Sequence, residues 1–394
     1  MISNFFLNDV GVVCALGSGR AAVAARALAG QSGIDATSDF ANGALIPLGV
    51  VRDALPSLEA YAVEVRSRNN QLALIAAAQI QDAVVRVVDR YGAHRVAIVV
   101  GTSTSGIGES ENAIRAYVQT GALPPSFSLG QQELGSLSAF LAMYFGVTGP
   151  AYVHSSACAS SAKAMASAAR LIRNGLADAV ITGGVDSLCG FTVAGFASLN
   201  LVSHHRCNPF SRNRDGINIG EGAALFLMTR DPSAVRLAGW GESSDGHHFS
   251  APDPSGRGAA IAIEAALASA HVSARDVEYV NLHATGSKAN DEMEGLVIST
   301  LLGNEIPTSG TKQLTGHTLG AAGALEAAIC WFAMDDANRG GALPPHLWDG
   351  DADPLIPPIR KVAINESLGH PARVTLSTSF AFGGANAALV LCRE

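Results

Sequence analysis

Cys158 is the residue whose setting most clearly suggests chemistry. A strand-like run over 151–153 leads into a turn of small residues, and an alanine-rich run over 162–172 predicts a helix directly after it. Cys158 therefore lies at or next to a helix N-terminus, where unpaired N–H groups and the helix dipole stabilise a thiolate and lower a thiol pKa from about 8.5. A lone cysteine is more often a small buried apolar residue in an alanine-rich packing seam, so other residues must decide.

Two histidines can complete an acyl-transfer site with this cysteine. His283 ends a strand-like run, and His317 begins a second alanine-rich helix in the same way as Cys158 begins the first. A thiolate nucleophile accepts an acyl group, while imidazole N–H groups stabilise the charge that develops on a carbonyl oxygen.

Other groups of histidine and cysteine do not have the spacing of a metal site. The segments 204–207 and 247–248 contain them, but no second pair follows at zinc-binding spacing. The glycine- and serine-rich segment 101–108 lacks the lysine and the spacing of a phosphate-binding loop. We therefore expect neither a metal nor a cofactor.

The elements that must position these residues alternate between strands and helices. Continuous apolar runs at 96–100 and 179–182 are typical of strands buried on both faces, and 72–91 has the spacing of an amphipathic helix. We expect the apolar face of that helix to include Leu72, Ala76, Ile80, Ala83 and Val87.

The second half of the chain repeats the order of the first. The matching segments are 99–102 with 280–285, 157–158 with 316–323, and 222–227 with 386–391. Each match is short, but their common order indicates a duplicated α/β unit. We expect an N-terminal half over 1–235 that carries the nucleophile and a C-terminal half over 236–394 that carries both histidines. Twofold-related halves would bring the three side chains to one cleft.

The composition indicates a cytoplasmic protein. Of the 394 residues, 48% are hydrophobic and 15% charged, which predicts a large buried fraction. The formal net charge of -8 argues against a nucleic-acid partner and requires an acidic protein partner to dock on a local basic patch. Six scattered cysteines without a CxxC pair fit reduced thiols, and no secretory signal is visible. No apolar run approaches the ~20 residues of a membrane span, since Glu326 interrupts the best candidate, 321–334.

Four segments of the chain resemble the β-ketoacyl-acyl carrier protein synthases, in order and in approximate spacing. They are 156–160 (SACAS), 283–287 (HATGS), 312–323 (KQLTGHTLGAAG) and 379–386 (SFAFGGAN), with supporting matches at 208–211, 214–216 and 220–223. The two-histidine pattern is similar to the elongating synthases of fatty-acid and polyketide synthesis, whereas the initiating type uses an asparagine and degradative thiolases a second cysteine. The resemblance implies an α/β, thiolase-like fold in which two duplicated halves form a layered α-β-α-β-α core.

The resemblance implies a decarboxylative condensation. Cys158 would take an acyl chain from the phosphopantetheine arm of an acyl carrier protein, and malonyl-carrier protein would then enter. His283 and His317 would bind its thioester carbonyl and stabilise the carbanion that remains when carbon dioxide leaves. This carbanion would attack the acyl thioester, whose oxyanion would lie against the backbone N–H groups of Cys158 and Phe382.

The resemblance also implies supporting roles. Lys312 and Glu294 would form an ion pair that organises the site, and Phe382 would act as an aromatic gate between the two substrate entrances. Asp291 would orient the local loop. Pantetheine binding is assigned to Thr285, Ser287 and Phe380.

The implied partners are the acidic acyl carrier protein and a second subunit. We assign carrier-protein docking to Arg66 and Arg68, although a solvated polar face would show the same pattern. The second subunit would be another copy of the chain or a related chain, with the strand over 151–153 pairing across the interface.

The chain departs from the family at four positions. Ala284 and Ala381 stand where the family usually has glycine, and Ser287 and Ala385 where it usually has threonine. The extra methyl groups at Ala284 and Ala381 can narrow the site or stiffen the gate, which is compatible with a specialised polyene or polyketide-like pathway as well as with fatty-acid synthesis. Two other functions stay open: a chain-length partner that does not condense, and a malonyl decarboxylase or hydrolase that forms no carbon–carbon bond.

Overall fold

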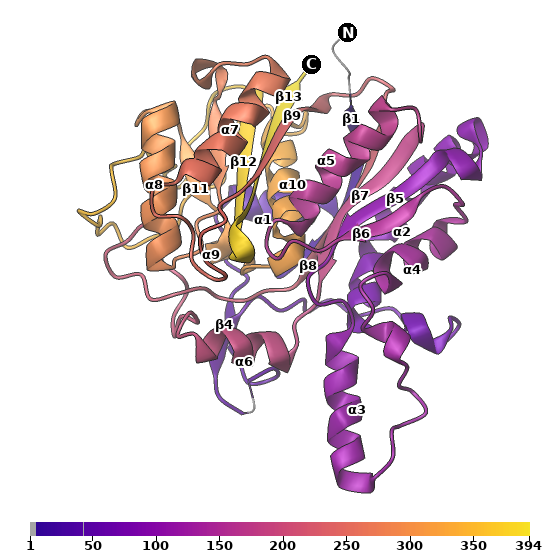
Figure 1. Cartoon of the computed structure of the whole chain (residues 1–394). Coiled ribbons are helices and arrows are strands. Elements are labelled where there is room, and N and C mark those ends of the chain that lie inside the picture. Colours follow the sequence, from indigo (N-terminus) through magenta and orange to yellow (C-terminus); the bar gives the residue numbers. More distant parts are fainter. Residues whose placement is uncertain (1–4, 42) are drawn as a thin grey trace.

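The computed structural model describes residues 5–41 and 43–394, and ten of its strands form two halves of one sheet (Figure 1). The first half consists of β1 (Phe6–Cys14), β5 (Val96–Gly101), β6 (Ala151–His154), β7 (Ala179–Asp186) and β8 (Gly222–Thr229). The second half consists of β9 (Val235–Ser244), β10 (Tyr279–Leu282), β11 (Thr308–Gly310), β12 (Val374–Ala381) and β13 (Ala385–Arg393). The short β2 (Gly17–Ser18) pairs with β1, and β3 (Asp35–Thr37) pairs with β4 (Ile46–Leu48).

Strand pairing is the same in both halves, which confirms the predicted duplication. In the first half β6, β5 and β7 run parallel, followed by β8 and β1 in antiparallel pairing. In the second half β11, β10 and β12 run parallel, followed by β13 and β9 in antiparallel pairing. Among the described residues, β1 and β9 join the halves through the pair Phe6 and Arg236. The division of the chain at 235 and 236 stays a prediction.

The helices form three layers around the two halves of the sheet (Figure 1). Helices α5 (Ser160–Arg173) and α10 (Ala322–Met334) lie between the halves. The outer helices are α2 (Arg68–Tyr91) and α4 (Ser136–Phe145) on the first half, and α7 (Arg257–Ala270) and α8 (Lys288–Leu302) on the second. A hydrophobic cluster fills each space between layers, so the α-β-α-β-α order is confirmed.

Small residues allow the two central helices to approach closely. A Cβ on Gly323 of α10 would lie 2.9 Å from the Cβ of Ala162 in α5, so only glycine fits this contact. Every residue of α10 is buried, including Glu326. A buried carboxylate needs a counter-charge or hydrogen bonds, and Lys312 supplies the counter-charge through one carboxylate oxygen of Glu326.

Helix α2 is long and apolar enough, by length and composition, to cross a membrane. Its predicted apolar face is buried against β1, β7 and β8, as the sequence indicated. The hydrophobicity of α2 is therefore that of a core helix in this fold.

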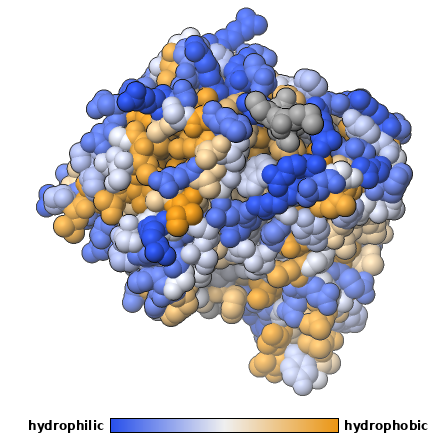
Figure 2. Space-filling model, turned by 45° about the horizontal axis from the view of Figure 1, so that its top comes forward, coloured by the Kyte–Doolittle hydropathy of each residue, from blue (hydrophilic) through white to orange (hydrophobic). Residues whose placement is uncertain are grey.

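Helix α3 (Ile107–Thr120) projects from the body of the molecule (Figure 1). It exposes three large apolar side chains, Ile114, Tyr117 and Val118. Figure 2 shows apolar side chains grouped over this projecting end. Exposed apolar groups of this kind typically mark a contact with a partner.

Candidate active site

Cys158 lies in the turn between β6 and α5, two residues before the helix begins. Ala157 has a φ of 46°, in the left-handed region that a residue with a Cβ rarely adopts. Ser160 holds the turn, because its Oγ accepts the N–H of Ser156 at 2.8 Å and donates to the oxygen of Ala157 at 2.6 Å. The predicted position of Cys158 next to a helix N-terminus is confirmed.

Burial dominates the resting thiol. It raises the pKa of Cys158 to about 12, although the charge of Lys312 and a backbone hydrogen bond from Phe382 favour the thiolate. The prediction of a lowered thiol pKa is therefore wrong for the free protein, because removing a thiolate from water outweighs the helix terminus. A proton acceptor is nevertheless in place, since Sγ lies 3.0 Å from Nε2 of His317.

The structure brings the two predicted histidines to this cysteine. The rings of His283 and His317 have centroids 5.3 Å apart and are nearly perpendicular, at 86°. The Sγ of Cys158 and one nitrogen of each ring all lie within 4.8 Å of one another. Burial, and then the charge of Lys312, lower the pKa of both histidines well below the ordinary value. Both rings are therefore neutral at pH 7, so that each has one nitrogen that donates an N–H and one that accepts a proton or hydrogen bond.

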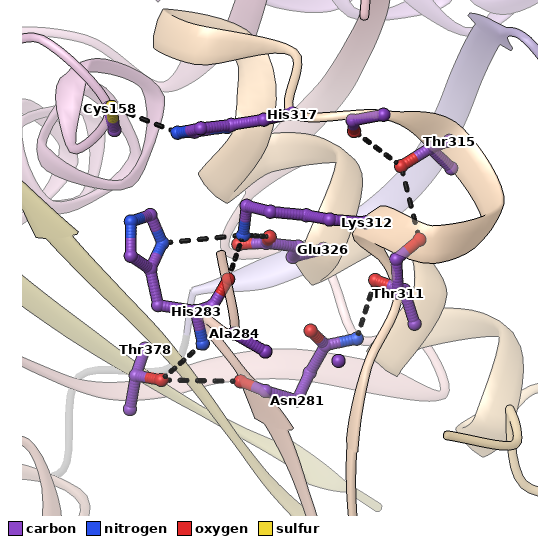
Figure 3. Close-up of polar contacts among 12 residues, drawn as sticks. Cys158, Asn281, His283, Ala284, Thr311, Lys312, Thr315, His317, Glu326 and Thr378 are labelled. Atoms are coloured by element: carbon purple, nitrogen blue, oxygen red, sulfur yellow. Dashed lines mark hydrogen bonds and ion pairs between the residues drawn. The ribbon is translucent and has the colours of Figure 1, made fainter. Parts of the chain in front are cut away.

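Lys312, on the short helix α9 (Lys312–Thr315), fixes the ring of His283 (Figure 3). Its Nζ lies 3.3 Å from Nδ1 of His283 and also donates to the main-chain oxygen of that residue. An ammonium group can only donate, so Nδ1 accepts and the ring proton lies on Nε2. Nε2 is then the nitrogen that can donate to a substrate.

The predicted ion pair between Lys312 and Glu294 is wrong. Lys312 pairs with Glu326 of α10, and both side chains are buried (Figure 3). Burial raises the pKa of Glu326 to about 7, and Lys312 opposes that shift. The sequence did contain a signal for this residue, because Glu326 is the one charge within the apolar run 321–334.

Glu294 instead anchors the backbone of the catalytic turn. Its carboxylate accepts the N–H groups of His283 and Ala284, both at 2.7 Å, and the hydroxyl of Thr378 at 2.9 Å. Burial raises its pKa to about 7. Asp291, one turn earlier in α8, accepts the N–H of Gly286 at 3.3 Å and so orients the same loop, as predicted.

Phe382 follows β12 in a turn whose next two glycines have φ values of 81° and 73°. Its ring lies 5.5 Å from that of Phe196 in α6 (Gly190–Ser198), a contact that the sequence did not indicate. Its backbone forms a hydrogen bond with Cys158, as expected for one of the two predicted oxyanion donors. The oxygen of Gly384 accepts the N–H of Asp245 at 2.8 Å, so a second loop supports this turn.

A cavity of about 350 Å³ leads to these groups. Cys158, His283 and His317 line it together with the three residues assigned to pantetheine, which are Thr285, Ser287 and Phe380. The hydroxyl oxygens of Thr285 and Ser287 lie 2.9 Å apart. The Phe380 ring packs edge-on against His283, with centroids 6.0 Å apart.

The two arginines assigned to carrier docking lie outside this cavity. Both side chains are partly exposed. Arg68 binds the fully buried carboxylate of Glu221 through two nitrogens, one of them at 2.8 Å. Arg66 donates to the main-chain oxygens of Tyr61 and Glu59, each at 2.8 Å. Arg68 thus has a structural role, and docking by Arg66 stays a prediction.

The two alanines at family glycine positions differ in backbone conformation. Ala284 has a φ of 41°, in the left-handed region, whereas Ala381 has an extended φ of -112° that any residue adopts. The backbone at position 381 therefore does not require glycine, whereas Ala284 has a strained backbone conformation beside His283.

Comparisons with known proteins agree with this geometry. Family models of the beta-ketoacyl synthase N-terminal and C-terminal domains match residues 56–234 and 234–347. Nodulation protein E of Rhizobium sp. is 31% identical over 97% of both chains, and 3-oxoacyl-[acyl-carrier-protein] synthase 2 of Synechocystis sp. is 31% identical over 77% of this chain and 76% of the relative. A structure of a ketosynthase in complex with its chain length factor, from Xenorhabdus doucetiae, matches with a TM-score of 0.93 and 40% identity over 100% of this chain and 98% of that one. The chain therefore belongs to the β-ketoacyl synthase family and is an acyltransferase with a thiolase-like fold.

Proposed function

We propose that the chain is the condensing subunit of a carrier-protein-dependent ketosynthase, with Cys158 as nucleophile and His283 and His317 as the decarboxylation pair. One observation carries this proposal: Sγ and the two imidazoles converge within 4.8 Å at the cavity. A thiol that takes up an acyl group and two neutral N–H donors are what the reaction requires.

The first half-reaction loads Cys158. Its sulfur attacks the acyl thioester on the carrier protein, and the oxyanion is held by the backbone N–H groups of Cys158 and Phe382. The thiol proton passes to Nε2 of His317 and from there to the departing pantetheine sulfur. An acyl thioester on Cys158 and a free carrier thiol result, so protons and electrons balance.

The second half-reaction forms the new carbon–carbon bond. The Nε2–H groups of His283 and His317 bind the thioester carbonyl of malonyl-carrier protein. When the bond to the carboxylate breaks and carbon dioxide leaves, these donors stabilise the enolate. The enolate carbon then attacks the acyl carbon on Cys158, whose bond to sulfur breaks, and the thiolate that leaves takes up a proton from water.

The cavity residues fit the access route for the carrier arm. Thr285 and Ser287 offer hydroxyl groups to the amides of pantetheine, and Phe382 with Phe196 forms the aromatic gate. We place the enzyme in the cytoplasm, a location supported by six free cysteines.

A second subunit completes the proposed enzyme. Strand β6 lies at the edge of the sheet, and α3 exposes apolar side chains, so we expect a second chain to cover both elements. The relative solved with its chain length factor supports a related chain as this partner. The alternative, that this chain is itself a silent chain-length partner, is disfavoured because Cys158, His283 and His317 are all present and assembled.

The test follows Cys158 by mass spectrometry. We expect incubation with acyl-carrier protein to add one acyl group to Cys158, malonyl-carrier protein to remove it with formation of a β-ketoacyl product, and Cys158→Ala to remain unmodified. The absence of an adduct would refute the proposal. Carbon dioxide release without a ketoacyl product would favour the malonyl decarboxylase instead.

A further inference from the structure

We propose that Ala284 and Gly310 form a matched pair that sets the distance between the catalytic His283 and its positioning residue Lys312. The inference rests on the proposed function only for the role of His283. The two residues lie where neighbouring parallel strands end, since Leu282 of β10 is in register with Gly310 of β11. Ala284 directly follows His283, and Lys312 begins α9 two residues after Gly310.

The space between the two strand ends holds one methyl group. A Cβ on Gly310 would lie 2.3 Å from the Cβ of Ala284, a separation that real Cβ atoms do not show. The next nearest atoms, both from the side chain of Gln313, would be 3.4 and 3.5 Å away. The steric constraint on position 310 therefore comes from Ala284 alone.

Ala284 is held in a strained conformation by its surroundings. Its φ of 41° is unfavourable for a residue with a Cβ, and its side chain is fully buried. Its N–H donates to the carboxylate of Glu294 at 2.7 Å, which fixes the backbone of the turn. Strain that persists under such constraint is typical of positions where geometry matters for function.

The methyl of Ala284 therefore acts as a spacer between two short segments. The segment at His283 presents both Nδ1 and the main-chain oxygen to Lys312, with Nδ1 3.3 Å from Nζ. A shift of either segment changes that contact, and with it the tautomer of the ring. Gly310 is the complement that allows the spacer to fit without pushing the segments apart.

The pair can be tested by a double-mutant cycle with Ala284→Gly, Gly310→Ala and the combined variant. Gly310→Ala inserts the clashing methyl, and Ala284→Gly removes the spacer. In the combined variant the single methyl group comes from position 310 instead of 284, where it makes only ordinary van der Waals contacts with Gln313. Gly340→Ala is the matched control, because nothing lies within 4 Å of its added Cβ.

We expect Gly310→Ala to lower the rate of malonyl decarboxylation by at least about tenfold, since ångström-scale misplacement of a catalytic group costs up to about 100-fold. The combined variant should return to within about threefold of the wild type, and acylation of Cys158 should change less than decarboxylation in every variant. The tautomer of His283, read by nitrogen chemical shifts in labelled protein, should be altered in Gly310→Ala and restored in the combination.

Purely additive effects in the cycle, or a wild-type rate in Gly310→Ala, would overturn the inference. If Gly310→Ala does not fold, Ala284→Gly tests the inference by itself, because this variant should retain the wild-type fold yet show an altered His283 tautomer. An unaltered tautomer there would also overturn it. The tautomer measurement needs no turnover, so its failure is distinct from a failure of the proposed reaction.

Discussion

Replacing Lys312 by methionine tests how the protein keeps His283 ready to donate a hydrogen bond. Methionine adapts to irregular space and carries no charge, so the ammonium group is lost without a large cavity. Two sets of contacts disappear, namely those with Nδ1 (3.3 Å) and the main-chain oxygen of His283, and the ion pair with Glu326. The first loss frees the ring to carry its proton on Nδ1, and the second leaves a buried carboxyl group without a counter-charge.

The two losses should have different sizes and different pH dependence. A hydrogen bond that involves a charged group contributes about 1.5–3 kcal/mol, which corresponds to a loss of about 10–100-fold in the rate of decarboxylation. Breaking a buried ion pair costs about 3–5 kcal/mol of stability if the remaining charge stays ionised. Burial already raises the pKa of Glu326 to about 7, and loss of Lys312 raises it further. Glu326 can therefore take up a proton at low pH, so the loss of stability should be greater at pH 8 than at pH 6.

The assay combines carbon dioxide release from malonyl-carrier protein with denaturant unfolding at both pH values. Lys312→Met with Glu326→Gln is the matched control, because it removes the unpaired carboxylate and should recover stability without recovering activity. Decarboxylation within about threefold of wild type in Lys312→Met would refute the tautomer argument. Full recovery of activity in the double variant would also refute it, since Lys312 would then serve only to neutralise Glu326.

Three further measurements test the surroundings of the site. Burial raises the pKa of Glu294 from 4.5 to about 7, so the folded protein favours the protonated form and the free energy of unfolding should fall as pH rises across that interval. Glu294→Gln should flatten this part of the plot of stability against pH, measured by denaturant titration. An unchanged slope would contradict the assignment. Zn²⁺ should inhibit condensation by binding the Cys158 thiol and the two imidazoles, and a chelator should reverse the inhibition. Cys158→Ala should bind zinc more weakly in calorimetry, whereas an affinity equal to that of the wild type would place the ion elsewhere. Arg68→Glu should lower Tm by removing the counter-charge of buried Glu221. Arg66→Glu should leave Tm unchanged and raise KM for the carrier protein. Equal losses of Tm in the two variants would show that both arginines are structural.

Much of the fold was predictable because its elements leave local patterns. Strands buried on both faces, β5 and β7, read as continuous apolar runs, and α2 shows its buried face as a helical period. The duplication was visible because the same strand and helix order recurs along the chain. Cys158, His283 and His317 could be named in advance because each lies in a short motif at an element boundary.

What could not be predicted depends on contacts across the fold. Glu294 and Glu326 are both buried glutamates, and only the packing of α10 against α9 decides which of them meets Lys312. The partner of Arg68 lies 153 residues away along the chain. The pKa of Cys158 follows from its depth of burial, which no local pattern reports.

The two catalytic histidines differ in how their protons are held. Nδ1 of His283 faces an ammonium group, so its proton is confined to Nε2, whereas Nδ1 of His317 has no hydrogen-bond partner among the described residues. Loading requires Nε2 of His317 to accept the proton of the Cys158 thiol, 3.0 Å away, since burial keeps that thiol protonated at neutral pH. Condensation requires the same nitrogen to donate to the malonyl carbonyl. A ring held in one tautomer can do only one of these tasks, so the unrestrained Nδ1 of His317 suits the histidine that changes role, and the restrained Nδ1 of His283 suits the one that only donates.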